Sequence, residues 1–456
     1  MKKIIDRNSA EGLLKDLGGE FAVIRNPAYI HPAFELAPLA PRLTGPLDRL
    51  SAAVMDMDGT TTTTEELCIH SLEYMLRAMS GKYTTAEWSG LDHTADYPNI
   101  IGNSTTKHVE YLITKYAGLL QTDRTKESFA YAALWTLICG KDAKRKQEVH
   151  VTLAKMDLVT MTEDPLFRDA AADPASVPGM RAAIGAELFG RYGGRMRPLS
   201  HTDLVTLGID IYYQRYHEIL QRIENGESRQ ISMELFHDPE KRLIQPMPGI
   251  LFFLPLLKGW LGDEAALFAD RLFEEYATKS GHEFPASERH SAASSLASLG
   301  RFFEQHPAKL AIVTSSIFYE ANIVMSEVFS VLSAQLASVP LSAGRQTLLR
   351  AKLQQYRNVY DAFITASDST EIRLKPHRDL YSIALHQLNI PTADFHRVIG
   401  FEDSESGTIA IRTAGIGRCI AVPFAQTKGH NFDAATLVAL GGIPEVVLSH
   451  NVFLNA

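Results

Sequence analysis

Short apolar runs that each end in polar residues mark the predicted strands of this chain. They cover residues 52–55, 309–313, 362–365, 397–400 and 418–422. Runs of about four to eight apolar residues bounded by turn residues are typical of buried strands in a parallel sheet. Helical periodicity follows in residues 317–330, 376–388 and 405–414. This alternation predicts an α/β fold with a Rossmann-like, doubly wound parallel sheet.

The alternation stops after the first strand, and residues 61–245 carry helical periodicity instead. Apolar residues recur at helical spacing in 107–120, 128–158 and 202–224. Asn225 and Gly226 form a helix stop signal after the last of these segments. Strand signals are few, so we expect residues 61–245 to form a separate α-helical cap domain. It is inserted into an α/β core of residues 51–60 and 246–456.

Residues 1–50 precede the core and are rich in proline. One short helix is predicted over residues 9–17, before Gly18 and Gly19. The prolines that follow are Pro27, Pro32, Pro38, Pro41 and Pro46. Prolines at this spacing forbid long helices. We therefore expect an N-terminal arm that wraps the surface of the core as a loop.

The composition is that of an ordinary globular protein, with 45% hydrophobic and 21% charged residues. A net charge of −8 argues against a nucleic-acid or anionic-membrane partner. Cys68, Cys139 and Cys419 form no CxxC pair, as expected of reduced cytoplasmic thiols. The start, MKKIIDRNSA, lacks the apolar run of a signal peptide, and no apolar stretch is long enough to span a membrane. We therefore expect a cytoplasmic protein, and the oligomeric state stays open.

Two carboxylates, Asp56 and Asp58, follow the first predicted strand within the segment DMDGT at residues 56–60. Open α/β sheets place their chemistry just beyond the carboxyl ends of the strands. Like charges a few ångströms apart near the surface repel by about 1–4 kcal/mol. Mg²⁺ is suited to offset this repulsion because it prefers oxygen ligands. A strand that runs into an Asx-Gly turn is the structural alternative for this pentapeptide alone.

Three further predicted elements place polar residues near the same edge of the sheet. They are Thr314, Ser315 and Ser316 after the second strand, Lys375 before the helix that follows the third, and Glu402 and Asp403 after the fourth. Each set has a structural explanation by itself, because hydroxyls and acids cap helices and a lysine is usually solvated. Their coincidence on one sheet favours a shared site.

Phosphoryl transfer is the chemistry that fits this set, because its catalysis consists mainly of positioning and electrostatics. Asp56 is the expected nucleophile, which would form an aspartyl-phosphate. Asp58 would protonate the leaving oxygen and then deprotonate water. Mg²⁺ is expected on Asp56, the Asp58 backbone carbonyl, Asp403 and Glu402.

The phosphate group is expected to meet hydroxyls and one cation. Thr314 and Ser316, with the N–H groups of the following helix start, would hold phosphate oxygens. Lys375 would pair with Asp56 and with the phosphate, which would lower the repulsion among the carboxylates.

The motifs resemble, in the same order, those of the haloacid dehalogenase (HAD) superfamily in its phosphatase and phosphomutase branch. They are DMDGT (56–60), IVTSS (312–316), LKPHRDLY (374–381) and GFEDSESG (400–407). Receiver domains carry similar residues in a different order. The resemblance implies a Rossmann-like core, a mobile cap inserted after the first motif, Mg²⁺ as cofactor and a small phosphorylated substrate. The insertion at residues 61–245 is much longer than usual for that family.

The same resemblance extends to residues around the substrate. It implies that Gly59, Thr60 and Ser315 lie at the phosphate. The polar segment 102–108 resembles the cap loop that meets the substrate in that family, which makes Asn103, Ser104 and Lys107 candidate substrate ligands. A plain helix cap is the structural alternative for this segment.

The type of reaction stays open at this point. Asp58 argues against dehalogenation, since dehalogenating relatives resemble this sequence but lack the second acid. Mutases of the branch place a cap-hinge histidine twelve residues after the nucleophile, where this chain has Cys68, with His70 two residues further on. We therefore expect a phosphatase. A mutase of the beta-phosphoglucomutase type and a catalytically silent binding protein remain as alternatives.

Overall fold

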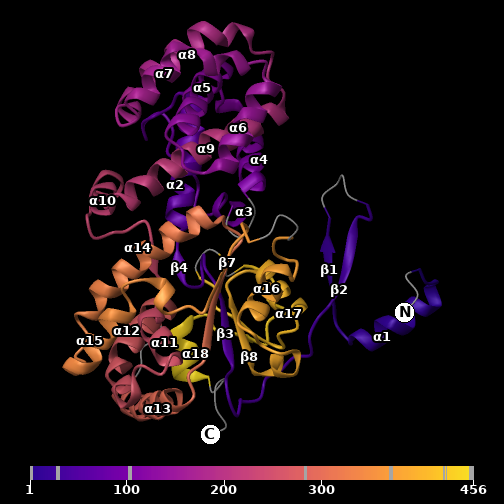
Figure 1. Cartoon of the computed structure of the whole chain (residues 1–456), viewed down its shortest axis with the longest axis vertical. Helices are drawn as coiled ribbons and strands as arrows, with labels where there is room; N and C mark the ends of the chain where they lie inside the picture. The colour runs from indigo at the N-terminus through magenta and orange to yellow at the C-terminus, as the bar shows by residue number, and fades with distance from the viewer. Residues whose placement is uncertain are drawn as a thin grey trace. The chain divides into compact units, whose positions relative to one another are not determined.

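Six parallel strands form the central sheet (Figure 1). In spatial order they are β10 (Leu437–Val438), β9 (Arg418–Ala421), β8 (Val398–Glu402), β3 (Ala52–Asp56), β6 (Lys309–Val313) and β7 (Ala362–Ile364). All neighbouring pairs are parallel. This computed structural model describes residues 4–26, 31–100, 105–281, 285–368, 373–424, 427 and 429–450. The predicted α/β class with a parallel sheet is confirmed.

The strand order reverses at β3, which pairs with β6 on one side and β8 on the other. Every residue of β3 and β8 is buried, which explains why both read as continuous apolar runs in the sequence. The five predicted strands are present. The prediction missed β10, because a two-residue strand is too short to leave a periodic signal.

Helices cover both faces of this sheet. On one face, Leu380 and Ala384 of α16 (Asp379–Gln387) and Ile411 of α17 (Glu405–Thr413) pack in one buried cluster with strand residues. On the other face, Phe253 of α11 (Ile250–Leu257) packs edge-on against Phe401 at a ring distance of 5.2 Å. Further helices of this unit are α12 (Ala269–Ser280), α13 (Ala286–Gln305), α14 (Phe318–Leu336), α15 (Ala343–Lys352) and α18 (Ile443–Ser449).

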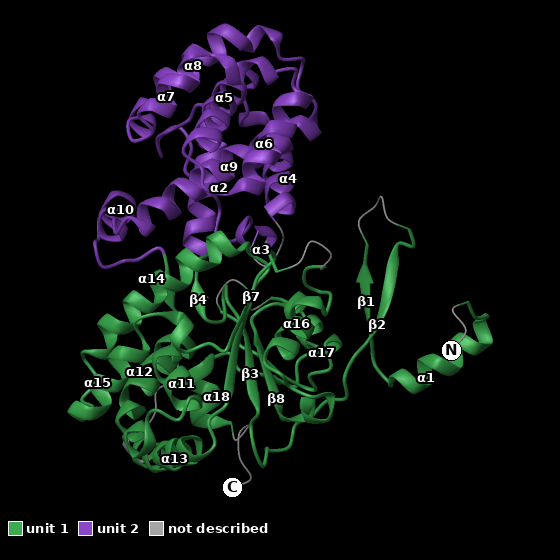
Figure 2. Cartoon of the chain, in the orientation of Figure 1, with its two compact units in different colours: residues 1–64, 244–456 green, residues 65–243 purple. Residues whose placement is uncertain are grey.

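The chain divides into two compact units, which Figure 2 colours separately. The larger comprises Met1–Thr64 and Ile244–Ala456, and the smaller comprises Glu65–Leu243. The expected limits of the insertion are residues 61 and 245. Residue 61 directly precedes β4 (Thr62–Thr63), and residue 245 begins β5 (Gln245–Pro246), with which β4 forms a short antiparallel pair. This pair holds the two ends of the inserted segment together.

The smaller unit is helical within the residues that the structure describes. Its helices are α2 (Glu65–Ser80), α3 (Tyr97–Ile100), α4 (Thr105–Lys115), α5 (Thr122–Ile138), α6 (Ala143–Lys155), α7 (Pro165–Ala172), α8 (Arg181–Tyr192), α9 (His201–Glu224) and α10 (Ser228–Phe236). The helical segment predicted at 128–158 is interrupted. A Cβ at Gly140 would lie 2.3 Å from the Thr136 carbonyl oxygen, and Asp142 caps a new helix there.

The N-terminal arm differs from the expected loop. After α1 (Arg7–Leu17), strands β1 (Phe21–Arg25) and β2 (Phe34–Pro38) form an antiparallel hairpin. Residues 21–24 form a continuous apolar run in the sequence, and their exposed–buried alternation is seen only in the folded hairpin. Pro38 is tolerated because it ends the strand. The segment after the hairpin is bound to the core, since the Ala40 N–H donates to the Arg412 carbonyl at 2.9 Å.

No helix in the described ranges combines the length and the apolar character that a membrane span needs.

Arg412 should contribute strongly to the stability of the larger unit. Its side chain is fully buried and donates to the Ala40 and Ala434 carbonyls, each at 2.8 Å, and to Glu20 Oε2 at 2.6 Å. Arg412→Leu is expected to lower the free energy of unfolding by about 3 kcal/mol, because buried carbonyls lose charged donors. Chemical denaturation of the full chain measures this change.

The matched control is Arg301→Leu, which removes an exposed ion pair with Asp263. Exposed pairs contribute about 1 kcal/mol or less. Equal destabilisation by the two substitutions would contradict the role of Arg412.

Candidate active site

Adjacent strand ends bring the predicted acidic residues together at the carboxyl edge of the sheet. Asp56 is the last residue of β3, and Glu402 is the last residue of the neighbouring β8. Carboxylate oxygens of Asp56, Glu402 and Asp403 lie within 4.8 Å of one another. All three residues are buried. These strand ends lie at the topological switch point of the sheet, where doubly wound sheets bind ligands.

Lys375 is the cation at the centre of this group. Its Nζ donates to Asp56 Oδ1, to Glu402 Oε1 at 2.6 Å and to the Val313 carbonyl at 3.3 Å. Burial alone would lower the pKa of Lys375, but the carboxylates of Asp56 and Glu402 together raise it above its ordinary value. Lys375 is therefore positively charged at neutral pH and bridges the ends of β3 and β8.

The environment of Asp56 strongly disfavours its charged form. Burial, followed by repulsion from Glu402, raises the pKa of Asp56 well above its ordinary value, although Lys375 opposes the rise. A divalent cation bound to the same oxygens would favour the charged carboxylate. The residues present therefore fit a hard cation, since several carboxylates share one lysine.

Glu402 uses both of its carboxylate oxygens on donors of the protein. Oε1 accepts from Lys375 and from the Tyr381 hydroxyl at 3.1 Å. Oε2 accepts from the Asp403 and Ser404 N–H groups at 3.0 and 3.1 Å and from Ser404 Oγ at 2.9 Å. Glu402 thus holds Lys375 in place, and the metal-ligand role expected for it would require the loss of one of these bonds.

Three hydroxyl groups hold the second acid, Asp58. Its Oδ1 accepts from Thr64 Oγ1 at 2.5 Å, and its Oδ2 accepts from Thr314 Oγ1 at 3.3 Å and Ser316 Oγ at 3.4 Å. Burial raises the pKa of Asp58 above its ordinary value, despite these hydrogen bonds. A raised pKa suits a group that must donate a proton. Sequence reasoning missed Thr64, whose only signal was its place in the run of threonines at 60–64.

The loop after Asp58 approaches the acidic residues closely. Gly59 has a φ of +81°, and a Cβ there would lie 2.6 Å from the Asp403 carboxyl group. Thr60 Oγ1 donates to Asp403 Oδ1 at 3.4 Å. Ser315, the remaining predicted phosphate ligand of the core, is exposed.

The candidate residues of the helical insertion belong to the smaller unit. Asn103 and Ser104 lie outside the described residues, and Lys107 is exposed on α4. His70, on α2, lies 3.4 Å from Arg215 Nη2. Burial, together with the charges of Arg215 and Arg77, lowers the pKa of His70 to about 4. His70 is therefore neutral at pH 7.

Comparison with protein-family profiles and with curated proteins gives no match. Solved structures that match include CbbY from Rhodobacter sphaeroides in complex with phosphate (15% identity, 87% of this chain and 96% of that chain, TM-score 0.37). Its variant in complex with xylulose-(1,5)bisphosphate also matches (14%, 89% and 100%, TM-score 0.38), as does a hydrolase from Pseudomonas syringae (11%, 89% and 100%, TM-score 0.34).

The parallel sheet, the helical insertion after the first strand and the strand-end positions of the motifs match what the resemblance to the HAD superfamily implies. The predicted α/β fold with a parallel sheet is confirmed.

Gly59→Ala tests whether the loop must approach Asp403. A side chain at this positive φ is strained and would displace the Asp403 carboxylate. We expect the dissociation constant for Mg²⁺ to rise at least about tenfold, as when the support of a metal ligand is lost. Titration calorimetry with MgCl₂ measures this constant. The control is Gly344→Ala, where a Cβ meets no atom within 4 Å. Equal Mg²⁺ affinity in the two variants would contradict the prediction.

Proposed function

We propose that this chain is a Mg²⁺-dependent hydrolase that transfers the phosphoryl group of a small phosphorylated metabolite to water. One observation carries this proposal: Lys375 bridges Asp56 and Glu402, while an oxygen of Asp403 lies within 4.8 Å of both carboxylates. Like charges gathered in this way cost free energy unless they bind a cation and an anionic substrate.

Asp56 acts as the nucleophile in this proposal. One carboxylate oxygen attacks phosphorus, the bond from phosphorus to the ester oxygen breaks, and Asp58 gives that oxygen a proton. Asp58 then accepts a proton from water as the water oxygen attacks the phosphorus of the aspartyl-phosphate. This second step releases inorganic phosphate and regenerates the Asp56 carboxylate.

The remaining residues hold charge and position. Asp56, Asp403 and the Asp58 backbone carbonyl would hold Mg²⁺, which when bound supplies positive charge that offsets the phosphate oxygens. Lys375 neutralises part of the negative charge through its ion pairs with Asp56 and Glu402. Thr314 and Ser316, which hold Asp58 through Oδ2, also lie at the position expected to receive phosphate oxygens.

Hydrolysis is favoured over mutase chemistry by the residues near the start of the insertion. The position where the mutases of this branch carry a histidine is Cys68, whose sulfur accepts from the Tyr212 hydroxyl at 3.5 Å. His70 is neutral and interacts with Arg215. Neither residue therefore supplies a positive charge for a second phosphate group.

Asp56→Asn is expected to lower kcat for p-nitrophenyl phosphate at least about a thousandfold, because the amide is a poor nucleophile. Release of p-nitrophenol with excess MgCl₂ measures this rate. The control, Asp263→Asn, alters an exposed carboxylate and should keep the wild-type rate. An active Asp56→Asn variant would refute the nucleophile. A wild-type chain without turnover on a panel of phosphorylated metabolites would favour a binding protein.

Asp403→Asn is expected to raise the MgCl₂ concentration needed for half-maximal turnover about 10- to 100-fold, because an amide oxygen binds Mg²⁺ more weakly than a carboxylate. EDTA should abolish wild-type turnover, and added MgCl₂ should restore it. Turnover that is unchanged by EDTA would contradict the metal requirement. Bisphosphate-primed conversion of a sugar phosphate faster than phosphate release would identify a mutase.

A further inference from the structure

The β1–β2 hairpin leaves one edge of β1 without hydrogen-bond partners among the described residues. The Leu39 N–H donates to the Glu20 carbonyl and the Asn26 N–H donates to the Ala33 carbonyl. Bonded pairs alternate along an antiparallel ladder, so Ala22 and Ile24 also pair with β2. The N–H and C=O groups of Phe21 and Val23 therefore point away from β2, toward the free edge.

The two faces of this hairpin differ in character. Ala22 and Ile24 are 7% and 4% exposed and lie on the inner face. On the outer face, Val23 is 59% exposed and its cross-strand neighbour Leu36 is 51% exposed. Exposed apolar side chains beside an unpaired strand edge mark an interaction site or an aggregation risk.

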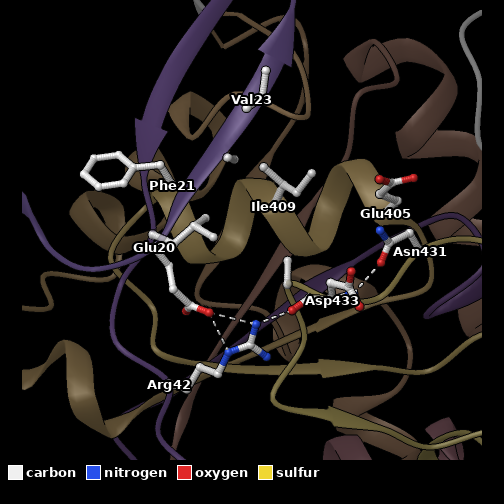
Figure 3. Close-up of a pocket in the computed structure, with 11 residues that line it drawn as sticks. Glu20, Phe21, Val23, Arg42, Glu405, Ile409, Asn431 and Asp433 are labelled. Atoms are coloured by element: carbon white, nitrogen blue, oxygen red, sulfur yellow. Dashed lines mark hydrogen bonds and ion pairs between the residues drawn. The ribbon is translucent and has the colours of Figure 1, made fainter.

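A cavity of about 400 Å³ follows this free edge (Figure 3). Four consecutive residues of the arm, 20–23, line one side of it, and Ile409 and Glu405 of α17 line the other. The remaining lining residues are Leu39, Arg42, Asn431, Asp433 and Ala434. The cavity therefore offers both apolar surface and the backbone groups of a strand.

The charges of the cavity are unevenly matched. Arg42 donates to Glu20 Oε1 and to the Ala435 and Asp433 carbonyls, so its guanidinium group is already bound by the protein. The side-chain carboxylates of Glu405 and Asp433 are exposed and form no ion pair among the described residues. The cavity thus lacks a cation to match these two carboxylates.

We propose that the free edge of β1 is a docking site for an extended segment of a partner protein. The segment adds to β1 as a third strand, and its backbone pairs with the outward groups of Phe21 and Val23. Side chains on its inner face enter the cavity, where a lysine or arginine meets Glu405 and Asp433 and a small apolar residue contacts Ile409.

Two other occupants match these features less well. A free alkylamine could pair with the carboxylates, but it has no peptide backbone to bond with Phe21 and Val23. A second copy of this chain would present β1 itself, whose inner-face residues are Ala22 and Ile24. Neither carries a positive charge, so a β1–β1 pairing would leave Glu405 and Asp433 unmatched.

An array of seven-residue peptides tests the proposal on the full chain and does not depend on any enzymatic activity. In each peptide Val and Thr alternate, and one position is replaced by Lys, Arg, Ala or Glu. Fluorescence anisotropy measures the binding of each peptide. We expect Lys and Arg peptides to bind at least about tenfold more tightly than Glu peptides, through charge complementarity. The substitution Asp433→Lys should restore the binding of the Glu peptides and abolish the binding of the Lys peptides.

Val23→Pro removes an N–H group that the hairpin does not use but that an added strand requires. It should weaken peptide binding at least about tenfold and leave the melting temperature within a few degrees of the wild type. Val23→Thr, which keeps the N–H group, is the matched control and should bind as the wild type does.

Three results would overturn the proposal. The first is an array in which no peptide binds, or in which Val23→Pro binds as well as the wild type. The second is full displacement of a bound Lys peptide by an equal concentration of butylamine, which would indicate an amine site. The third is a wild-type dimer in sedimentation experiments that excludes the peptide and becomes monomeric in Val23→Pro, which would indicate self-pairing.

Discussion

Repulsion among buried carboxylates is the constraint on which the site depends. Asp56, Asp58, Glu402 and Asp403 are all at or beside the ends of two neighbouring strands, and Lys375 is the cation that contacts two of them. Burial removes the water that would otherwise screen these charges. The raised pKa of Asp56 and the raised pKa of Lys375 are two results of this one arrangement. The surrounding protein holds Glu402 and Asp58 in this arrangement through several hydrogen bonds each.

Those hydrogen bonds come from residues with no chemistry of their own. Tyr381 and Ser404 hold Glu402, and Thr64 holds Asp58. Gly407 is needed for a steric reason, because a Cβ there would lie 1.8 Å from the Glu402 carboxyl group. The proposed nucleophile, general acid and lysine are thus placed by a shell of polar donors and close backbone contacts.

The N-terminal arm is held by α17, the helix that follows the strand ends of the site. Arg412, near the end of α17, holds the arm through the Ala40 carbonyl and Glu20, while Glu405 at the start of α17 lines the cavity beside β1. Asp403 lies two residues before that helix. A segment bound along β1 would therefore contact the helix that follows the proposed metal ligand. This gives the arm a physical connection to the site that a loop on the surface would lack.

The sequence by itself determined the parallel sheet, the helical insertion and which acidic residues lie together at the strand ends. Each depends on local information: apolar runs of strand length, helical periodicity, and acids or hydroxyls directly after a predicted strand. It also determined that Asp56 and Asp403 would be close, because both follow strands of one parallel sheet. The motif order supplied the HAD-type resemblance without any structural information.

Only the tertiary structure decided how the residues of the site share their contacts. That Glu402 binds Lys375 and Tyr381 with one oxygen, and three donors with the other, depends on strand order and on the path of α16. The hairpin of the arm was missed because residues 21–24 are a short apolar run without polar alternation, next to a proline-rich segment. Strand β10 was missed because two residues carry no period. Contacts between residues far apart in sequence are set by packing, and packing leaves no regular spacing in the chain from which they could be read.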